Sequence, residues 1–383
     1  MSLSVTPEPA KNKPTLLVID DEAGPRDALQ VILRPFFNIQ TAESASAAID
    51  VLNSQPVDLI TLDQKLPDRQ GIDLLQDIKH HHTGVEVIII TGYGSLKSAM
   101  EGIRHGAAGY LLKPFNVTEL LSLVNQTLEK KQRLDFLRHF IGTSTGLWGS
   151  DTESAQAWKE LLVGYRAIGK SPSDNASHAE EMPDLLPVLS DLLEAKDRQL
   201  LNHCSRVSFY ATLLANRINL TLAEQKSLAL GAFLHDIGKI GPEAYQFADD
   251  EITVTGKAVG NRHHPERGAK LVLPLGLPAE VGQIIAYHHE RWDGSGYPFG
   301  LQGEGIPQLA RIVCIAQTFD HLTAELPGRT PLSIDDACQQ MLSYAGSHFE
   351  AKLTELFARV AQECKASLPA MAMATTPTDR SDS

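Results

Sequence analysis

The chain has 383 residues, 43% of them hydrophobic, and its 47 acidic and 34 basic residues give a formal net charge of −13. This length predicts two globular domains, because single cores seldom grow beyond about 250–300 residues. The acidic balance excludes a nonspecific nucleic-acid surface, which needs a basic face, so we expect no DNA partner. No apolar run reaches the roughly 18 residues of a spanning helix, and we expect no membrane partner.

The chain begins with a predicted disordered tail over residues 1–14, which lacks the apolar core of a signal peptide. Its four cysteines show no CxxC spacing, as is typical of a reducing compartment. We therefore expect a cytoplasmic protein.

From residue 15 to about residue 130, short runs rich in Val, Ile and Leu alternate with amphipathic stretches. The runs are TLLVID (15–20), FNIQTA (37–42), VDLITLD (57–63), VEVIIIT (85–91) and AGYLLK (108–113). They lack a strict period of two, which is typical of strands buried on both faces of a parallel sheet. The pattern predicts a doubly wound α/β domain, whose last helix begins near Asn116 and continues to about residue 140.

Chemically capable residues follow four of these runs. They are Asp20 and Asp21 after the first, Asp63 after the third, Thr91 at the end of the fourth and Lys113 after the fifth. Ligands gather at the carboxyl ends of parallel strands, and converging carboxylates suit Mg²⁺. Asp63 is then the candidate nucleophile toward a phosphoryl donor. An acid that follows a strand is alternatively a helix cap, but capping does not explain all four strand ends together.

Residues 15–130 resemble the receiver domain of two-component response regulators. The resemblance implies that Asp63 is the phosphoacceptor, that Asp20 and Asp21 bind Mg²⁺ together with it, and that a sensor histidine kinase is a partner. The matching positions also include the switch residues Thr91 and Lys113, the switch aromatic Tyr110, the loop residue Gly71 and the cis peptide Lys113–Pro114.

The chain changes character after the first domain. We predict a helical extension and linker over 131–184, where Gly-, Ser- and Pro-rich stretches flank one helical patch, AWKELLVGYRAI. A helical period returns at residue 185, which predicts an all-α domain over 185–366, followed by a disordered tail over 367–383.

The second domain carries an unusual set of histidines. The candidate ligands are His203, His235, Asp236, His264, His288 and His289. Imidazoles with one bridging carboxylate suit a pair of divalent ions such as Fe, Mn, Zn or Ni, and such a pair supports in-line phosphoryl displacement. Asp236 is the candidate bridge, and Lys239, one helical turn on, is placed to meet a phosphate. A lone helical histidine is more often an ordinary polar residue, but an HD pair in an apolar helix is costly to bury without a metal.

The motifs HDIGKIG, HHP, HHERWDGSGYP and ARIVCIA occur in order. They resemble the HD-GYP branch of the HD phosphohydrolases, over about 185–365. The resemblance implies a phosphodiesterase that hydrolyses cyclic di-GMP, with Lys239 at the substrate phosphate and GGDEF-domain proteins as potential partners. Its supporting loop comprises Arg291, Asp293, Gly294, Gly296, Tyr297 and Pro298.

Several positions depart from this family pattern. Gln317 stands where the family has a metal-ligand Asp, and a neutral amide binds a divalent cation more weakly. Gln199 replaces the Glu of members that hold a third metal, so we expect two ions at most. The family's RPYR segment reads LPGR over 326–329, and the loop over 241–257 also differs. Asp320 lies one helical turn beyond Gln317 and is not a simple replacement for it.

We therefore expect a response regulator in which phosphorylation of Asp63 controls a cyclic di-GMP phosphodiesterase. One alternative is a degenerate HD-GYP module that binds nucleotide or proteins without turnover. Another is hydrolysis of a different nucleotide or phosphoester. The apolar positions of the helix over 116–140 predict either a homodimer or packing on their own domain.

Overall fold

The computed structural model describes residues 13–92, 96–168, 185–241, 262–325 and 329–365. The chain divides into two compact units, one ending at Gln132 and the other beginning at Arg133. Among the described residues, no helix has the length and apolar character needed to cross a membrane.

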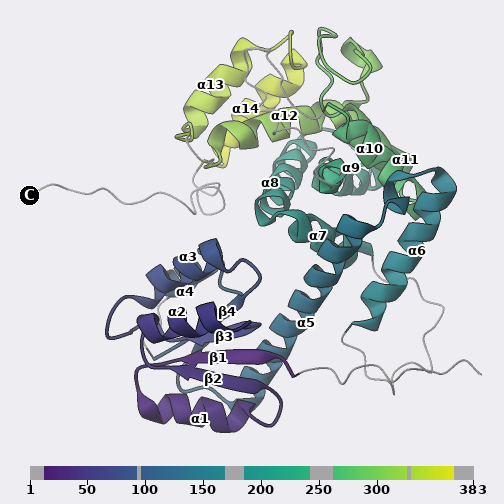
Figure 1. Ribbon diagram of the computed structural model, residues 1–383. Helices are drawn as coiled ribbons and strands as arrows, with labels where there is room; N and C mark the ends of the chain where they lie inside the picture. Colours follow the sequence, from purple (N-terminus) through teal and green to yellow (C-terminus); the bar gives the residue numbers. More distant parts are fainter. Residues whose placement is uncertain (1–12, 93–95, 169–184, 242–261, 326–328, 366–383) are drawn as a thin grey trace, which may run out of the picture. The chain divides into compact units, whose positions relative to one another are not determined.

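The first unit is a five-stranded parallel sheet in the order β2-β1-β3-β4-β5, with helices on both faces (Figure 1). Its strands are β1 (Thr15–Ile19), β2 (Asn38–Ala42), β3 (Leu59–Leu62), β4 (Glu86–Thr91) and β5 (Gly109–Leu112). Its helices are α1 (Ala23–Leu33), α2 (Ala45–Ser54), α3 (Gly71–His81), α4 (Leu96–Arg104) and the first half of α5 (Val117–Thr143). The doubly wound fold predicted from the sequence is confirmed.

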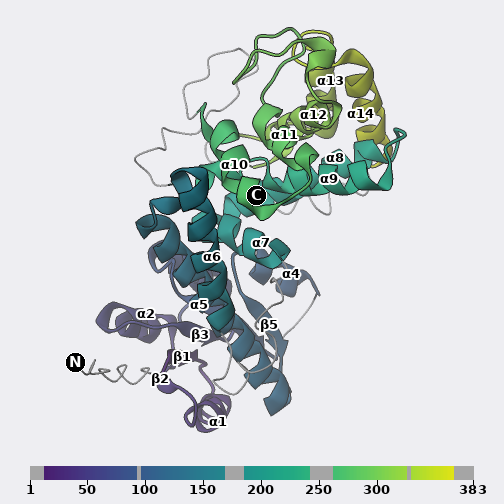
Figure 2. The same ribbon diagram turned by 90° about the vertical axis from the view of Figure 1, so that its right-hand side faces the viewer.

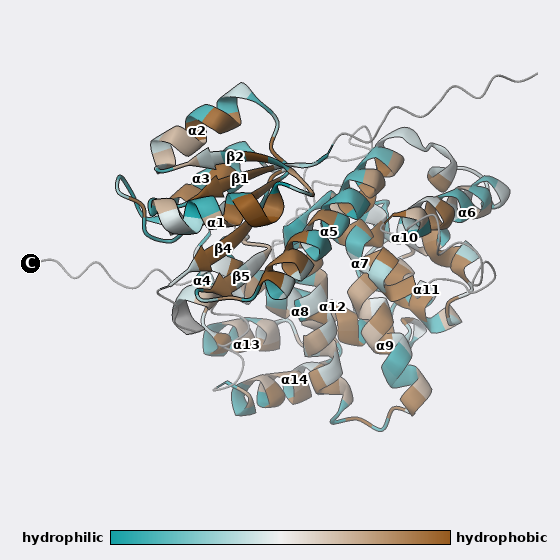
Figure 3. Cartoon of the chain, turned by 90° about the horizontal axis from the view of Figure 1, so that it is seen from below, coloured by the Kyte–Doolittle hydropathy of each residue, from teal (hydrophilic) through white to brown (hydrophobic). Residues whose placement is uncertain are grey.

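The sheet has a hydrophobic core on each face, which explains the continuous apolar runs. Along β1, Leu17 and Ile19 belong to the core beneath α2 and α3, whereas Leu16 and Val18 belong to the core beneath α1 and α5. Side chains alternate between the two faces of a strand, so both sets must be apolar. The hydrophobic colouring of β4 in Figure 3 reflects the same double burial.

Helix α5 begins after Asn116, whose Oδ1 accepts a hydrogen bond from the backbone N–H of Glu119 at 2.9 Å. This side chain satisfies one of the free N–H groups of the first turn, as predicted. Leu120, Val124 and Leu128 are buried in the core of the first unit. The apolar stripe predicted for a dimer is thus used within the chain, and the homodimer stays a prediction without support from these contacts.

The second unit is helical, as predicted. It comprises α6 (Asp151–Ala167), α7 (Leu185–Lys196), α8 (Arg198–Ala215), α9 (Leu222–Leu234), α10 (His264–Val272), α11 (Ala279–Tyr287), α12 (Gln308–Thr323), α13 (Ile334–Ser343), α14 (Ala351–Glu363) and the short 3₁₀ segments η1 (Gly146–Trp148), η3 (Ile237–Ile240), η5 (Leu273–Leu275) and η6 (Gly303–Gly305). Helices α8 and α9 pack side by side beneath α11 and α12 (Figure 2).

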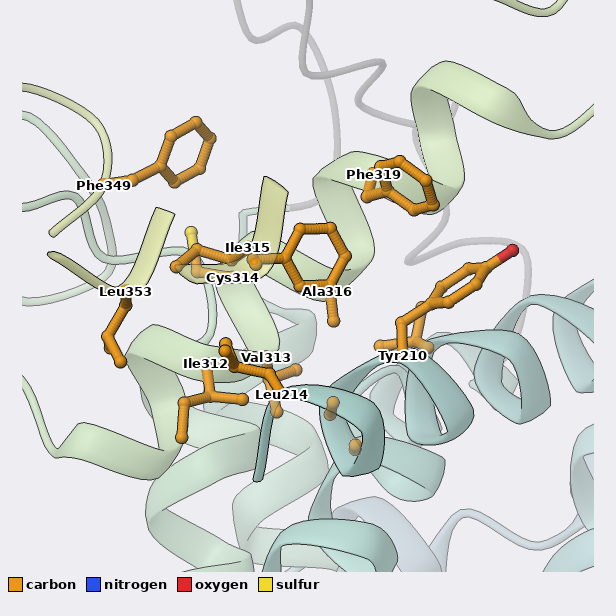
Figure 4. Close-up of a cluster of buried hydrophobic side chains, with 14 of the residues drawn as sticks. Tyr210, Leu214, Ile312, Val313, Cys314, Ile315, Ala316, Phe319, Phe349 and Leu353 are labelled. Atoms are coloured by element: carbon orange, nitrogen blue, oxygen red, sulfur yellow. The ribbon is translucent and has the colours of Figure 1, made fainter. Parts of the chain in front are cut away.

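Helix α12 runs through the larger core of this unit. Ile312, Ile315 and Phe319 are buried, and the Phe319 ring meets Tyr210 of α8 edge-on, with ring centroids 5.1 Å apart (Figure 4). A helix that is apolar on most of its circumference must be enclosed by its neighbours. This packing fixes where the polar residues of α12, Gln317 and Asp320, lie.

A second core lies under the amino-terminal part of this unit. It combines Leu134, Leu137 and Ile141 of α5 with Trp158 of α6 and Leu192 of α7. Ser150 and Glu153 form a capping box that starts α6. The described part of the predicted extension is therefore helical to Ala167. Residues 169–184, the tail beyond residue 365 and the first twelve residues lie outside the described residues.

Candidate functional site

Four strand ends of the sheet bring polar side chains to one edge. Asp20 follows β1, Asp63 follows β3, Thr91 ends β4 and Lys113 follows β5, and these strands are neighbours in the sheet. Asp20, Asp63 and Thr91 are all buried. The parallel arrangement thus places the residues predicted from the sequence at a common edge, with Asp21 exposed beside them.

Lys113 joins the two buried carboxylates. Its Nζ donates to Asp20 Oδ2 at 2.7 Å and to Asp63 Oδ2 at 2.6 Å. Burial alone would lower the pKa of Lys113, but its hydrogen bonds to Asp20 and Asp63 outweigh this effect and raise the pKa above its ordinary value. The ammonium is therefore held charged at the position where a phosphoryl group on Asp63 would need a counter-charge.

The acids of this pocket have the chemistry of a magnesium site. Mg²⁺ binds through one or two carboxylates and keeps several waters, and Asp20 and Asp63 offer such carboxylates side by side. Asp20 and Asp63 share the Lys113 ammonium, while Asp21 is exposed beside them. The participation of all three acids in a magnesium site stays a prediction.

The loop after Asp63 has a geometric requirement for glycine. A Cβ atom on Gly71 would lie 2.4 Å from the carbonyl oxygen of Asp63, closer than real Cβ contacts allow. The Gly71 N–H also donates to Gln64 O at 2.7 Å, which closes the loop. Of the other predicted switch features, Tyr110 Oη lies 3.2 Å from Ser98 Oγ, and the Lys113–Pro114 peptide is cis.

The second site gathers five histidines around Asp236, and they come from separate elements. His203 lies on α8, His235 directly follows α9, His264 begins α10, and His288 and His289 directly follow α11. Asp236 precedes η3, where a Cβ on Gly238 would lie 2.0 Å from the carbonyl oxygen of His264. Gly238 therefore allows η3 to pack tightly against the start of α10, which brings Asp236 close to His264.

The two oxygens of Asp236 face two different sets of imidazole nitrogens. Oδ1 lies 3.2 Å from His264 Nε2 and 3.7 Å from His288 Nε2. Oδ2 lies 3.4 Å from His235 Nε2 and 3.6 Å from His203 Nε2. His289 joins the first set, because its Nε2 is 3.1 Å from His264 Nε2. Each set has ligand atoms within 4.8 Å of one another, and Asp236 belongs to both.

Backbone carbonyls orient two of the imidazoles. His235 Nδ1 lies 2.7 Å from Ala232 O, and His288 Nδ1 lies 2.8 Å from Ile285 O. A carbonyl oxygen can only accept, so Nδ1 carries a proton on both rings, and Nε2 is the nitrogen that each ring turns toward Asp236. Histidine ligands of metals are commonly oriented in this way.

Asp320 performs the same task for His203. Its Oδ2 is 2.7 Å from His203 Nδ1, while Arg206 donates from Nε to Oδ1 at 2.6 Å and from Nη2 to Oδ2 at 2.9 Å. Burial would raise the pKa of Asp320, but the bonds from His203 and Arg206 lower it to about 2. Asp320 is thus an ionised support for a candidate ligand, a role that its sequence position did not reveal.

The charges of the cluster show that the histidines cannot all be protonated. Burial lowers the pKa of His288 and His289 well below the ordinary value, and the neighbouring imidazoles reinforce the effect. For His235, burial also lowers the pKa, but the Asp236 carboxylate outweighs it and raises the pKa to about 10. Burial also lowers the pKa of His203, so three of the five rings favour the neutral form, which is the form that binds a metal.

The arrangement fits a pair of divalent ions. Four imidazole nitrogens and the Lys239 ammonium lie within 2.9–3.7 Å of the two Asp236 oxygens, which are buried. A buried carboxylate is costly unless groups of opposite charge face it. Ions bridged by Asp236 would satisfy both oxygens and the ring nitrogens that face one another.

Lys239 and the two glutamines also have defined places. Lys239 Nζ lies 2.9 Å from Asp236 Oδ2, at the edge of the cluster. Gln317 is buried, and its Nε2 donates to the backbone carbonyl of His288 at 2.9 Å. Gln199 is exposed at the start of α8. Of the other departures, Leu326 and most of the loop over 241–257 lie outside the described residues.

The loop over 290–303 is anchored by Glu290, which the sequence reasoning missed. Glu290 is buried, and its two carboxylate oxygens accept from the N–H groups of Phe299 at 2.7 Å and Leu301 at 3.0 Å. The Tyr297 ring stacks on His289, with centroids 4.6 Å apart. The loop thereby supports one of the candidate ligands. The sequence did offer one indication of this role, because Glu290 is a charged residue directly after the paired histidines His288 and His289.

The other loop residues predicted from the sequence form its turns. Asp293 Oδ1 accepts from the N–H of Ser295 at 2.9 Å, Gly294 has a φ of +82°, and the Tyr297–Pro298 peptide is cis. At Gly296 a Cβ atom would lie 2.3 Å from the backbone nitrogen of Arg291, so only glycine fits there.

Comparisons with known proteins identify both units. The family described as response regulator receiver domain matches residues 16–125, and the family described as HD domain matches residues 187–353. A probable cyclic di-GMP phosphodiesterase of Vibrio cholerae serotype O1 is 29% identical over 90% of this chain and 77% of its own length.

Two further relatives have related names. The cyclic di-GMP phosphodiesterase response regulator RpfG of Xanthomonas campestris pv. campestris is 25% identical over 90% of this chain and 87% of its own length. The 3'3'-cGAMP-specific phosphodiesterase 2 of Vibrio cholerae is 33% identical over 46% of this chain and 34% of its own length. The chain therefore combines an amino-terminal response regulator receiver domain with a carboxy-terminal HD domain.

Proposed function

We propose that phosphorylation of Asp63 controls a metal-dependent phosphodiesterase in this chain, and that its substrate is cyclic di-GMP. One observation carries the proposal: the buried Asp236 turns one oxygen toward each of two histidine sets. The names of the relatives that cover most of the chain support the choice of substrate.

In the receiver domain, a carboxylate oxygen of Asp63 attacks the phosphorus of a phosphohistidine on a sensor kinase. The new P–O bond forms as the P–N bond breaks, and the kinase imidazole leaves. Lys113 already contacts Asp63 and is available to bind an oxygen of the transferred phosphoryl group. Mg²⁺ held by Asp20 and Asp63, with Asp21 nearby, would supply further charge neutralisation. Thr91 is buried beside the pocket, and its hydroxyl would hydrogen-bond the phosphoryl group on Asp63.

In the HD domain, His203 and His235 with Asp236 Oδ2 would hold one ion, and His264, His288 and His289 with Oδ1 would hold the other. Bound ions of this kind supply Lewis-acid activation of water and of the phosphoryl oxygens. Lys239 lies beside Asp236 and would bind a non-bridging oxygen of the substrate phosphate. Hydrolysis adds one water and breaks one P–O bond, giving the linear dinucleotide.

Gln317 favours a second candidate, a module that binds nucleotide without turnover. Its amide donates to the backbone of His288, so the side chain already has a structural role. An amide oxygen would also bring no charge to a metal. The substitution Gln317→Asp distinguishes the two: activity that appears only in this variant assigns the natural chain to the binding module.

The test is hydrolysis by the purified full chain loaded with Mn²⁺ or Fe²⁺. Cyclic di-GMP and 3'3'-cGAMP are supplied separately, and products are separated by chromatography. We expect linear dinucleotide from cyclic di-GMP, and none from the variant Asp236→Asn. No product with either metal, beside an active control enzyme, would refute the proposal. Faster hydrolysis of 3'3'-cGAMP than of cyclic di-GMP would refute the proposed substrate.

A further inference from the structure

The second unit contains a cavity away from the histidine cluster. It has a volume of about 170 Å³ and lies among η1, the first turn of α6 and the middle of α10. None of the candidate metal ligands lines it, and neither does any residue of the supporting loop.

Two buried polar atoms on the wall have no partner among the residues that the structure describes. They are the indole Nε1 of Trp148 and the hydroxyl oxygen of Ser154, whose side chain is 5% exposed. An indole N–H can only donate, and a hydroxyl can both donate and accept. Buried groups of this kind are normally hydrogen-bonded. By contrast, Trp158 on the same helix as Ser154 donates its Nε1–H to Leu271 O at 2.8 Å.

The wall also carries charge and apolar surface. Arg267 and Lys270 of α10 contribute two positive charges, and Asp151 contributes one negative charge. Leu147 and Leu271 supply apolar surface beside the Trp148 ring. Donors, an excess of positive charge and an apolar floor together match an anion that has a hydrophobic body.

We propose that this cavity binds a small organic anion, with an apolar body of about the size of benzene and one carboxylate or phosphate group. A cavity of about 150 Å³ holds benzene, so the volume suits such a body. Trp148 and Ser154 hydrogen-bond the anionic group, and Arg267 balances its charge. Because α10 also begins with His264, the ligand binds to the helix that supplies a candidate metal ligand.

The experiment is calorimetric titration of the full chain with three probes. Benzoate carries the ring and the charge, benzamide carries the ring without the charge, and inorganic phosphate carries the charge without the ring. We expect saturable 1:1 binding of benzoate, with benzamide weaker by about tenfold or more, because hydrogen bonds to a charged group are stronger. Equal affinity for benzamide, equal affinity for phosphate, or no benzoate binding would each overturn the proposal.

Variants locate the site. Trp148→Phe keeps the ring but removes the N–H, and Ser154→Ala removes the hydroxyl, so each weakens benzoate binding by about two- to tenfold. Ser227→Ala is the matched control, since Ser227 is also a buried serine but lies on α9 outside the cavity. Unchanged benzoate affinity in both cavity variants, with circular dichroism like that of the wild type, would also overturn the proposal.

Discussion

At the residue scale, the structure shows contacts of Asp320 and Gln317 that the sequence did not predict. The HD pair could be predicted as a ligand pair because burying it beside apolar residues is costly without a metal. The structure places that pair directly after α9. The role of Asp320 could not be predicted, because its value comes from a contact with His203, which is 117 positions away. Gln317 was predicted as a weak ligand, and the contact with the His288 carbonyl gives its amide a supporting role beside the cluster.

Replacing Asp320 with Asn tests its support of His203. The variant loses the charge that holds the His203 ring and leaves Arg206 without its carboxylate. Loss of such support typically weakens metal binding by about 10- to 100-fold. We expect the ion on the His203 side to be lost first in a chelator titration followed by metal analysis, with the other ion retained. Asp335→Asn, an exposed acid paired with Lys365, is the control. Equal retention in both variants would contradict the role.

Replacing Asp63 with Asn tests the phosphoacceptor. The amide cannot act as the nucleophile, so incubation with acetyl phosphate and Mg²⁺ should add one phosphoryl group to the wild type and none to the variant. Intact-protein mass spectrometry gives the readout. Asp77→Asn, an exposed acid on α3, should be modified as the wild type is. A phosphoryl group on the Asp63→Asn variant would place the acceptor elsewhere.

At the element scale, the sequence pattern identified the strands and most helices correctly. The expected burial on both faces is confirmed for β1, β3 and β4. It is wrong for β2, an edge strand in which only Ala42 is buried. The segment after α5 was harder, because its glycines and serines are typical of a linker. Tertiary packing of Leu147 and Trp158 stabilises helical structure there, and such packing has no local signature.

The loop over 290–303 should depend on Glu290. In Glu290→Gln, one of the two backbone N–H groups now bound by the carboxylate would face an NH₂ group, which cannot accept. An unsatisfied buried group costs about 1–3 kcal/mol. For a unit of this size each kcal/mol lowers Tm by about 2–4 °C. We therefore expect the Tm of the HD domain in Glu290→Gln to fall by a few degrees or more in calorimetry. The control variant Glu304→Gln, on η6, should leave Tm unchanged. Identical Tm values for the wild type and Glu290→Gln would show that Glu290 does not anchor the loop.

At the scale of the whole molecule, one chain combines a pocket built from strand ends with a cluster built from helix ends. Both sites gather residues that are far apart in sequence, and both use a buried carboxylate held by cationic or imidazole neighbours. In the receiver the carboxylate is the proposed nucleophile, and in the HD domain it is the proposed bridge between ions. The different chemistry follows from the partners, which are an ammonium in one site and five imidazoles in the other.

If Asp236 bridges two ions, the number of metal ions bound per chain depends on its carboxylate. The protein is loaded anaerobically with Fe²⁺ or with Mn²⁺, freed of loose ions, and measured by elemental analysis beside Asp236→Asn. Because Asp236 faces both histidine sets, we expect two ions per HD domain in the wild type and fewer than one in the variant, after Mg²⁺ in the receiver is counted separately. Two ions retained by Asp236→Asn, or none bound by the wild type, would contradict the bridge.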